Sequence, residues 1–92
     1  MKQESAETLA LQALTWLAGQ EDLIGAFLNA TGSSAADLAG GAARPEFLGS
    51  VLDFLVMEDA WVIAFCDAHG VRYEAPMQAR AALPGGETVH WT

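Results

Sequence analysis

Basic residues are scarce in this chain: Lys2, Arg44, Arg72 and Arg80 stand against 12 acidic residues, which gives a net charge of −8. A surface with this charge repels phosphate backbones, so we expect no nucleic-acid partner bound by charge neutralisation. The same charge repels anionic membranes. The longest uninterrupted apolar run, residues 60–66, is also far shorter than the roughly 20 residues of a membrane span. We therefore expect no membrane partner either.

Cysteine is almost absent as well, since Cys66 is the only one. A single cysteine excludes an intramolecular disulfide framework and any zinc site built from several cysteines. The first residues lack the charged, apolar and small-residue order of a signal peptide. We therefore expect a cytoplasmic protein.

β-Branched residues are few, whereas Ala, Leu and Gly dominate a composition that is 52% hydrophobic and 17% charged. Strong helix formers in this proportion predict an all-α fold. A chain of 92 residues suits one domain with a single core. We predict one compact bundle of five or six short helices over residues 1–92. Residues 1–4 are expected to fray, and residues 88–92 to form an irregular tail that Val89 and Trp91 anchor.

The densest apolar stretch runs from Phe47 to His69. If it formed one helix, Glu58 and Asp59 would fall inside the apolar stripe, and an unpaired buried carboxylate is costly. We therefore predict two helices rather than one, with a sharp break near Val56 or Met57 and an acidic N-cap on the second helix. The rest of the chain is expected to pack around this pair.

Capping signals delimit the remaining helices. Ser34 and Asp37 have the spacing of a capping box, which predicts a short helix over residues 35–39 that ends at Gly40 and Gly41. Residues 71–74 alternate too briefly for a strand and are predicted to form a loop. The other expected helices run from Ser5 to just before Gly19, from Glu21 to Gly32, from Pro45 to the break, from the break to Gly70, and from Pro76 to Leu83.

Cys66, Asp67 and His69 are the nearest approach to a reactive cluster. A metal site needs three or four ligands, and a Cys–His nucleophile needs a third orienting group. Asp67 points away on a helix, and nothing places His90 nearby. The favoured interpretation is a buried thiol used as a small apolar side chain, with His69 interacting with the helix dipole. The glycine pairs lack the lysine of a phosphate loop. We therefore expect no catalytic, cofactor-binding or metal-binding residues.

Large side chains at the edge of the apolar stripe form the candidate interaction patch. Phe54 and Trp61 lie at its flank, where a place in the core is favoured over an exposed one. Met57 and Met77 are the other candidates. The predicted patch therefore consists of Phe54, Met57, Trp61 and Met77.

Several segments resemble a known family: WLA at 16–18, FLNATG at 27–32, LDFLVMEDAWVIAFC at 52–66, and LPGG at 83–86 with a Trp in the tail. Together they are similar to a family of small helical bacterial proteins of unknown function, over the range from about Leu9 to Trp91. The resemblance implies a compact all-helical domain. It implies no activity, cofactor or site residue.

These features favour a small acidic non-enzymatic interaction or regulatory module that acts through an apolar patch. Its partner would be another protein or a second copy of the chain in a homodimer. The alternative is a small-molecule-binding or catalytic domain that uses Cys66 and His69. A third hypothesis is an acidic protein that competes with nucleic acid for a basic partner, which would require acidic residues on one face. The residues in question are Glu21, Asp22, Asp37 and Glu58.

Overall fold

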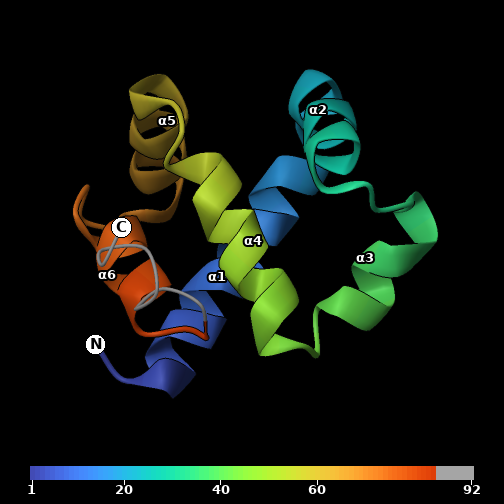
Figure 1. Cartoon of the computed structure of the whole chain (residues 1–92). Coiled ribbons are helices and arrows are strands. Elements are labelled where there is room, and N and C mark those ends of the chain that lie inside the picture. Colours follow the sequence, from blue (N-terminus) through green and yellow to red (C-terminus); the bar gives the residue numbers. More distant parts are fainter. Residues whose placement is uncertain (85–92) are drawn as a thin grey trace, which may run out of the picture.

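The computed structural model describes residues 1–84 and contains six α-helices and no strand over that range (Figure 1). The predicted all-α fold is therefore confirmed. Val89 and Trp91, the predicted tail anchors, lie outside the described residues. The helices are α1 (Gln3–Ala18), α2 (Glu21–Thr31), α3 (Ala35–Gly41), α4 (Pro45–Leu55), α5 (Asp59–His69) and α6 (Ala75–Ala81).

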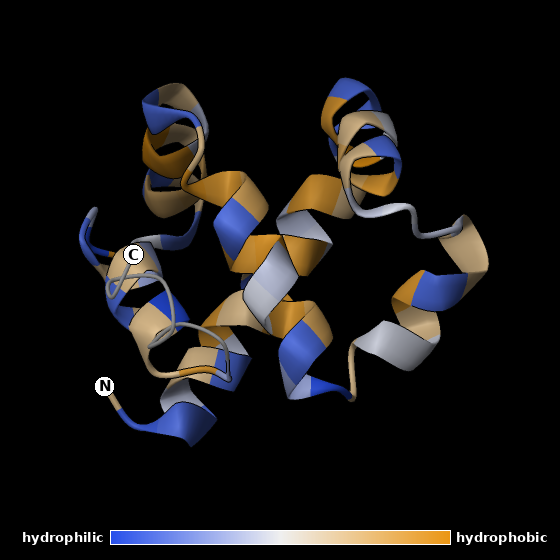
Figure 2. Cartoon of the chain, viewed as in Figure 1, coloured by the Kyte–Doolittle hydropathy of each residue, from blue (hydrophilic) through white to orange (hydrophobic). Residues whose placement is uncertain are grey.

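Helix α4 lies at the centre of the fold, where it packs against α1, and α6 packs against both (Figure 1). The expectation that all helices gather around the Phe47–His69 pair is therefore wrong for the second half of that pair. The reason lies on α1, where Ala6, Ala10 and Ala13 are fully buried and form a stripe of small side chains. Small side chains let two helix axes approach closely, so α1 rather than α5 covers α4. Figure 2 shows apolar positions concentrated where α1 and α4 cross.

The break inside the central apolar stretch is confirmed, since α4 ends at Leu55 and α5 begins at Asp59. Glu58 occupies the N-cap position with an extended backbone, but its side chain makes no capping hydrogen bond. Its carbonyl oxygen instead accepts bonds from the N–H groups of Trp61 and Val62. The acidic pair therefore stays at an exposed joint and does not enter the core.

Helix α1 begins earlier than predicted, at Gln3 and not after Ser5. A side-chain pair within the first two turns accounts for the difference. The Gln3 amide donates to the Glu7 carboxylate at 2.9 Å, and the Thr8 hydroxyl donates to the carbonyl of Glu4 at 3.1 Å. Side-chain pairs at i,i+4 spacing such as Gln3–Glu7 stabilise the first turns of a helix, whereas the Thr8 bond to the backbone gives no such support. Ser5 therefore lies inside the helix and does not cap it, and Gln3 and Glu4, which were expected to fray, are helical.

The capping box of α3 is confirmed, with the Asp37 carboxylate accepting a hydrogen bond from the Ser34 N–H at 2.8 Å. This bond, followed by the bond with the Ser34 hydroxyl, lowers the pKa of Asp37. The helix nevertheless continues to Gly41, two residues beyond the predicted end. A Cβ atom on Gly41 would lie 2.5 Å from the ring of Phe47, so the glycine serves close packing against α4 rather than termination.

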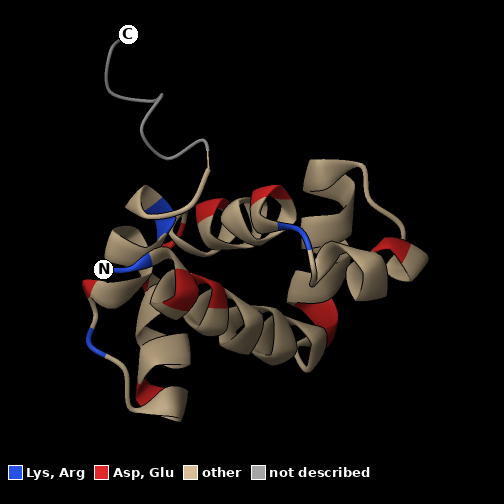
Figure 3. Ribbon diagram, turned by 90° about the horizontal axis from the view of Figure 1, so that it is seen from below, with Lys and Arg blue, Asp and Glu red and all other residues tan. Residues whose placement is uncertain are grey.

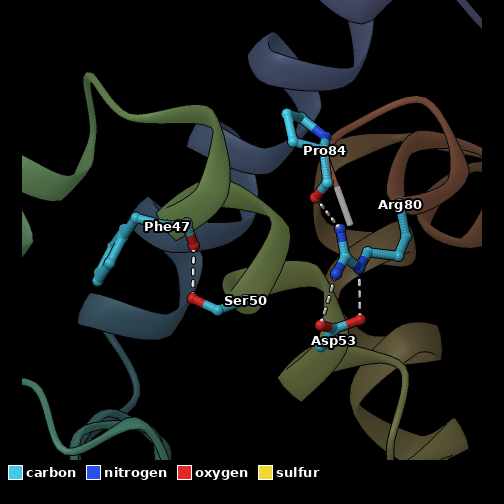
Figure 4. Close-up of polar contacts among 5 residues, drawn as sticks. All are labelled: Phe47, Ser50, Asp53, Arg80 and Pro84. Atoms are coloured by element: carbon cyan, nitrogen blue, oxygen red, sulfur yellow. Dashed lines mark hydrogen bonds and ion pairs between the residues drawn. The ribbon is translucent and has the colours of Figure 1, made fainter. Parts of the chain in front are cut away.

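A clasp of polar contacts fastens α6 and the residues after it to α4 (Figure 4). The Arg80 guanidinium donates to both carboxylate oxygens of Asp53 and to the carbonyl of Pro84, the last at 3.0 Å. A Cβ atom on Gly49 would come within 2.5 Å of Arg80 Nη1, so the guanidinium lies directly on the α4 backbone. Helix α6 itself ends at Ala81, earlier than the predicted Leu83. The residues that follow turn back so that Pro84 reaches Arg80.

Candidate interaction surface

Cys66 and His69 occupy different environments, although both lie on α5. The Cys66 side chain is 1% exposed, and its Sγ donates to the carbonyl oxygen of Arg72 at 3.4 Å. Burial raises the pKa of this thiol, and the negative charges of Asp67 and Glu74 raise it further. The exposed imidazole of His69 packs against the Phe65 ring, with 4.9 Å between centroids. The thiol is therefore bonded to the backbone, and the arrangement favours a neutral sulfhydryl over a nucleophile.

The buried environment of Cys66 predicts slow reaction with a disulfide reagent such as dithionitrobenzoate. We expect the native chain to react at least about tenfold more slowly at pH 8 than the same chain in denaturing urea. The raised pKa of the thiol also slows the reaction, because it reduces the fraction of reactive thiolate at the pH of the assay. Stopped-flow absorbance measures the two rates. Equal rates, or a pH profile with a pKa below that of a free cysteine, would contradict the prediction.

Acidic residues are spread over several helices (Figure 3). Glu21 and Asp22 open α2, Asp37 is tied into the capping box of α3, and Glu58 precedes α5. Helices α2 and α3 lie on one side of α4 and α5 lies on the other (Figure 1). Within residues 1–84, no three His, Cys, Asp or Glu side chains are grouped as metal ligands would be. The same residues contain no helix long and apolar enough to cross a membrane.

An apolar groove of about 280 Å³ opens between the end of α4, helix α5 and helix α6. We call it the α5–α6 groove. Ile63, Tyr73 and Met77 remain 46%, 54% and 67% exposed around it, whereas the large side chains between α1 and α4 are buried. Six residues line the groove: Val56, Asp59, Val62, Ile63, Tyr73 and Met77.

Tyr73 lines both this groove and a more open depression of about 380 Å³ at the loop that follows α5. Its hydroxyl donates to Asp67 Oδ1 at 2.8 Å, which fixes the phenol end of the ring. This hydrogen bond and the charge of Asp67 raise the pKa of the phenol, which favours its neutral form. The apolar ring face is therefore held beside the groove.

Two carboxylates lie at the groove. Asp59 lines it directly, and Asp67 lies behind Tyr73. Arg72, which directly precedes the lining residue Tyr73, is bonded to Glu74, with 2.7 Å between Nη2 and Oε1. Arg80 is bonded to Asp53 in the clasp. The groove therefore combines an apolar floor with carboxylates at its rim, and both of these arginines already bind carboxylates.

The structure separates the four predicted patch residues. Met57 and Met77 are 69% and 67% exposed, and Met77 lines the groove. Phe54 is buried in the core, the place the sequence favoured, where its ring stacks on the half-buried Trp61 at 4.8 Å. The structure thus brings Met77 to the groove and places Phe54 in the core, where it contacts Phe27 and Trp61.

Sequence reasoning missed four apolar groove residues, Val56, Val62, Ile63 and Tyr73, as surface residues. One signal was present. Ile63 falls about 200° around the helix from the buried Phe65, since each residue advances 100°. A helix that is apolar on its outer face as well as its inner face is expected to have a second contact surface.

A family model described as "Protein of unknown function (DUF3572)" matches residues 3–86. The match agrees with the resemblance to a family of unknown function. No curated protein matches the chain, and no solved structure matches it either.

Proposed function

We propose a function from geometry, because the chain belongs to the DUF3572 family, which is described only as a family of unknown function. The chain acts as a small acidic, non-enzymatic interaction module that binds a protein partner through the α5–α6 groove. One observation carries the proposal. Ile63, Tyr73 and Met77 stay about half exposed or more around one apolar groove. Covering such side chains is favourable by about 25 cal/mol for each Å² of apolar surface removed from water.

The surroundings of Cys66 support this proposal over the alternative of a reactive thiol. Its Sγ is bonded to a backbone carbonyl, and the ring of His69 packs on Phe65. The depression beside Cys66 is lined by residues 66–67 and 70–74, which do not include His69. A Cys–His pair that shared a cavity would have favoured catalysis.

Crosslinking in native lysate tests the proposal when variants are compared. Ile63→Glu and Met77→Glu place a charge in the groove, and Leu11→Glu adds the same charge on α1, where Leu11 is 39% exposed. We expect the wild-type and Leu11→Glu chains to capture the same protein in similar amounts. The captured amount should fall by at least about tenfold with either groove variant. That protein should then bind the purified wild-type chain in a two-component assay. Capture that is equal for all four chains would contradict the proposal.

A further inference from the structure

We infer that the partner segment is a basic amphipathic helix, whose apolar face enters the α5–α6 groove while its basic residues meet the carboxylates at the rim. The inference rests on the proposed function and specifies the chemistry of the partner. Three properties of the groove carry it: its size, its apolar lining and its charge.

The size of the groove favours side chains over a free metabolite. Pockets that bury a small molecule usually enclose roughly 300–1,000 Å³. The α5–α6 groove, at about 280 Å³, lies at the lower end of that range, and it is open to solvent rather than enclosing. Such a space takes a few apolar side chains presented by a larger surface, as an i, i+3/i+4 row on a helix does.

The lining comes from two helices that form the sides of the groove. Val62 and Ile63 belong to α5 and Met77 belongs to α6, while Tyr73 lies in the segment between them. Two helices that each offer apolar side chains to one groove provide contacts for the apolar face of a third helix. Methionine is unbranched and flexible, so Met77 adapts its shape to the side chains that enter.

The charge identifies the partner as basic. Asp59 lies in the lining, Glu58 precedes it, and Asp67 is bonded to the lining residue Tyr73. Arg72, the arginine nearest to Asp67 in sequence, is bonded to Glu74. Lysine and arginine on the flanks of an apolar helix face would therefore find unneutralised carboxylates within reach, which favours both encounter and correct register.

The same charge disfavours a second copy of the chain as occupant. Each chain carries a net charge of −8, and two copies that met at this groove would bring their carboxylate rims together. Like charges across an interface oppose association.

The test uses defined peptides and the full chain. The probe is a fluorescein-labelled peptide of about 18 residues, or five helical turns, with leucine along one face and lysine elsewhere. One comparison peptide has glutamate at every lysine position. The other has the composition of the probe in scrambled order, so that it has the charge without the apolar face. Fluorescence anisotropy measures each dissociation constant against the wild-type chain and its variants.

We expect the basic amphipathic peptide to bind, and its affinity to fall by at least about tenfold with Ile63→Ser or Met77→Ser. Leu11→Ser, an exposed change on α1, should leave it unaltered. Asp59→Asn should weaken binding by about two- to fivefold and flatten its dependence on salt, because one attractive charge is lost. The scrambled and acidic peptides should bind much more weakly than the probe.

Two kinds of result would overturn the inference. If the scrambled peptide bound as tightly as the probe, or if the groove variants left the affinity unchanged, binding would depend on net charge alone and not on the groove. Acidic peptide that binds the groove as well as the basic one, or a dimer in analytical ultracentrifugation that Ile63→Ser abolishes, would give the groove another occupant. Either of these last two results would contradict the inference of a basic helical partner but would still agree with the groove being a contact surface. By contrast, equal capture by the wild type and its three glutamate variants in the crosslinking test would contradict the proposed function itself.

Discussion

Replacing Phe27 by alanine is expected to lower the free energy of unfolding by about 3–5 kcal/mol, the usual cost of removing a buried aromatic ring. Phe27 is the one fully buried side chain on α2. Its ring meets those of Phe47 and Phe54 edge to face, with centroids 5.8 and 5.5 Å away. The substitution therefore leaves a cavity and removes two aromatic contacts at once.

Urea denaturation followed by circular dichroism measures this effect. Asn29→Ala is the control, because Asn29 is exposed on the same helix and its loss should change stability by less than about 0.5 kcal/mol. Since small domains are stable by only about 5–15 kcal/mol, the Phe27 variant should be close to unfolding at physiological temperature. A loss below about 1 kcal/mol would contradict the view that this ring fastens α2 to the core.

The sequence predicts the apolar stripe of α2 but not which residue of the stripe is fully buried. Leu23, Ile24, Phe27 and Leu28 all fall on one face, as the helical period requires. In the structure only Phe27 is fully buried, and the three aliphatic residues stay partly exposed. Depth of burial depends on how α2 is tilted against α4, and that angle is set by the partner helix.

The sequence predicts those helix boundaries that are determined by residues close to the boundary. The break between α4 and α5 follows from two acidic residues inside an apolar stripe, and the capping box at Ser34 follows from spacing alone. Gly32 and Gly70 end their helices with φ of 72° and 65°, a conformation that glycine adopts without strain. Each of these features is determined within a few residues of chain.

Long-range packing could not be predicted in this way. That α1 rather than α5 covers α4 depends on how closely three alanines allow two helices to approach. The α5–α6 groove is also assembled from three separate segments, so its lining has no continuous signature. Only the out-of-phase Ile63 marks it in sequence, and a surface isoleucine by itself is common.

The Arg80 clasp joins positions 27 residues apart, and its loss should have the second-largest effect. Arg80→Met keeps most of the side-chain volume but removes three hydrogen bonds, and we expect the free energy of unfolding to fall by about 2 kcal/mol. The Arg80 side chain is only 18% exposed, so water cannot fully replace its contacts, whereas the Asp53 side chain is 53% exposed and can be rehydrated. The cost should therefore be moderate rather than that of a fully buried ion pair.

The chain offers a matched control in its other arginine–carboxylate pair. Arg72 binds Glu74 at 2.7 Å, but its side chain is 85% exposed, so Arg72→Met should cost less than about 0.5 kcal/mol. Gly49→Ala probes the clasp from the opposite side, since the added methyl group would displace the guanidinium from the surface of α4. If the clasp holds α6 in place, Gly49→Ala should destabilise the wild-type chain and add little in the Arg80→Met background, where the guanidinium is absent. Equal losses for Arg80→Met and Arg72→Met, or fully additive losses for Gly49→Ala and Arg80→Met, would instead show that α6 is held by apolar packing alone.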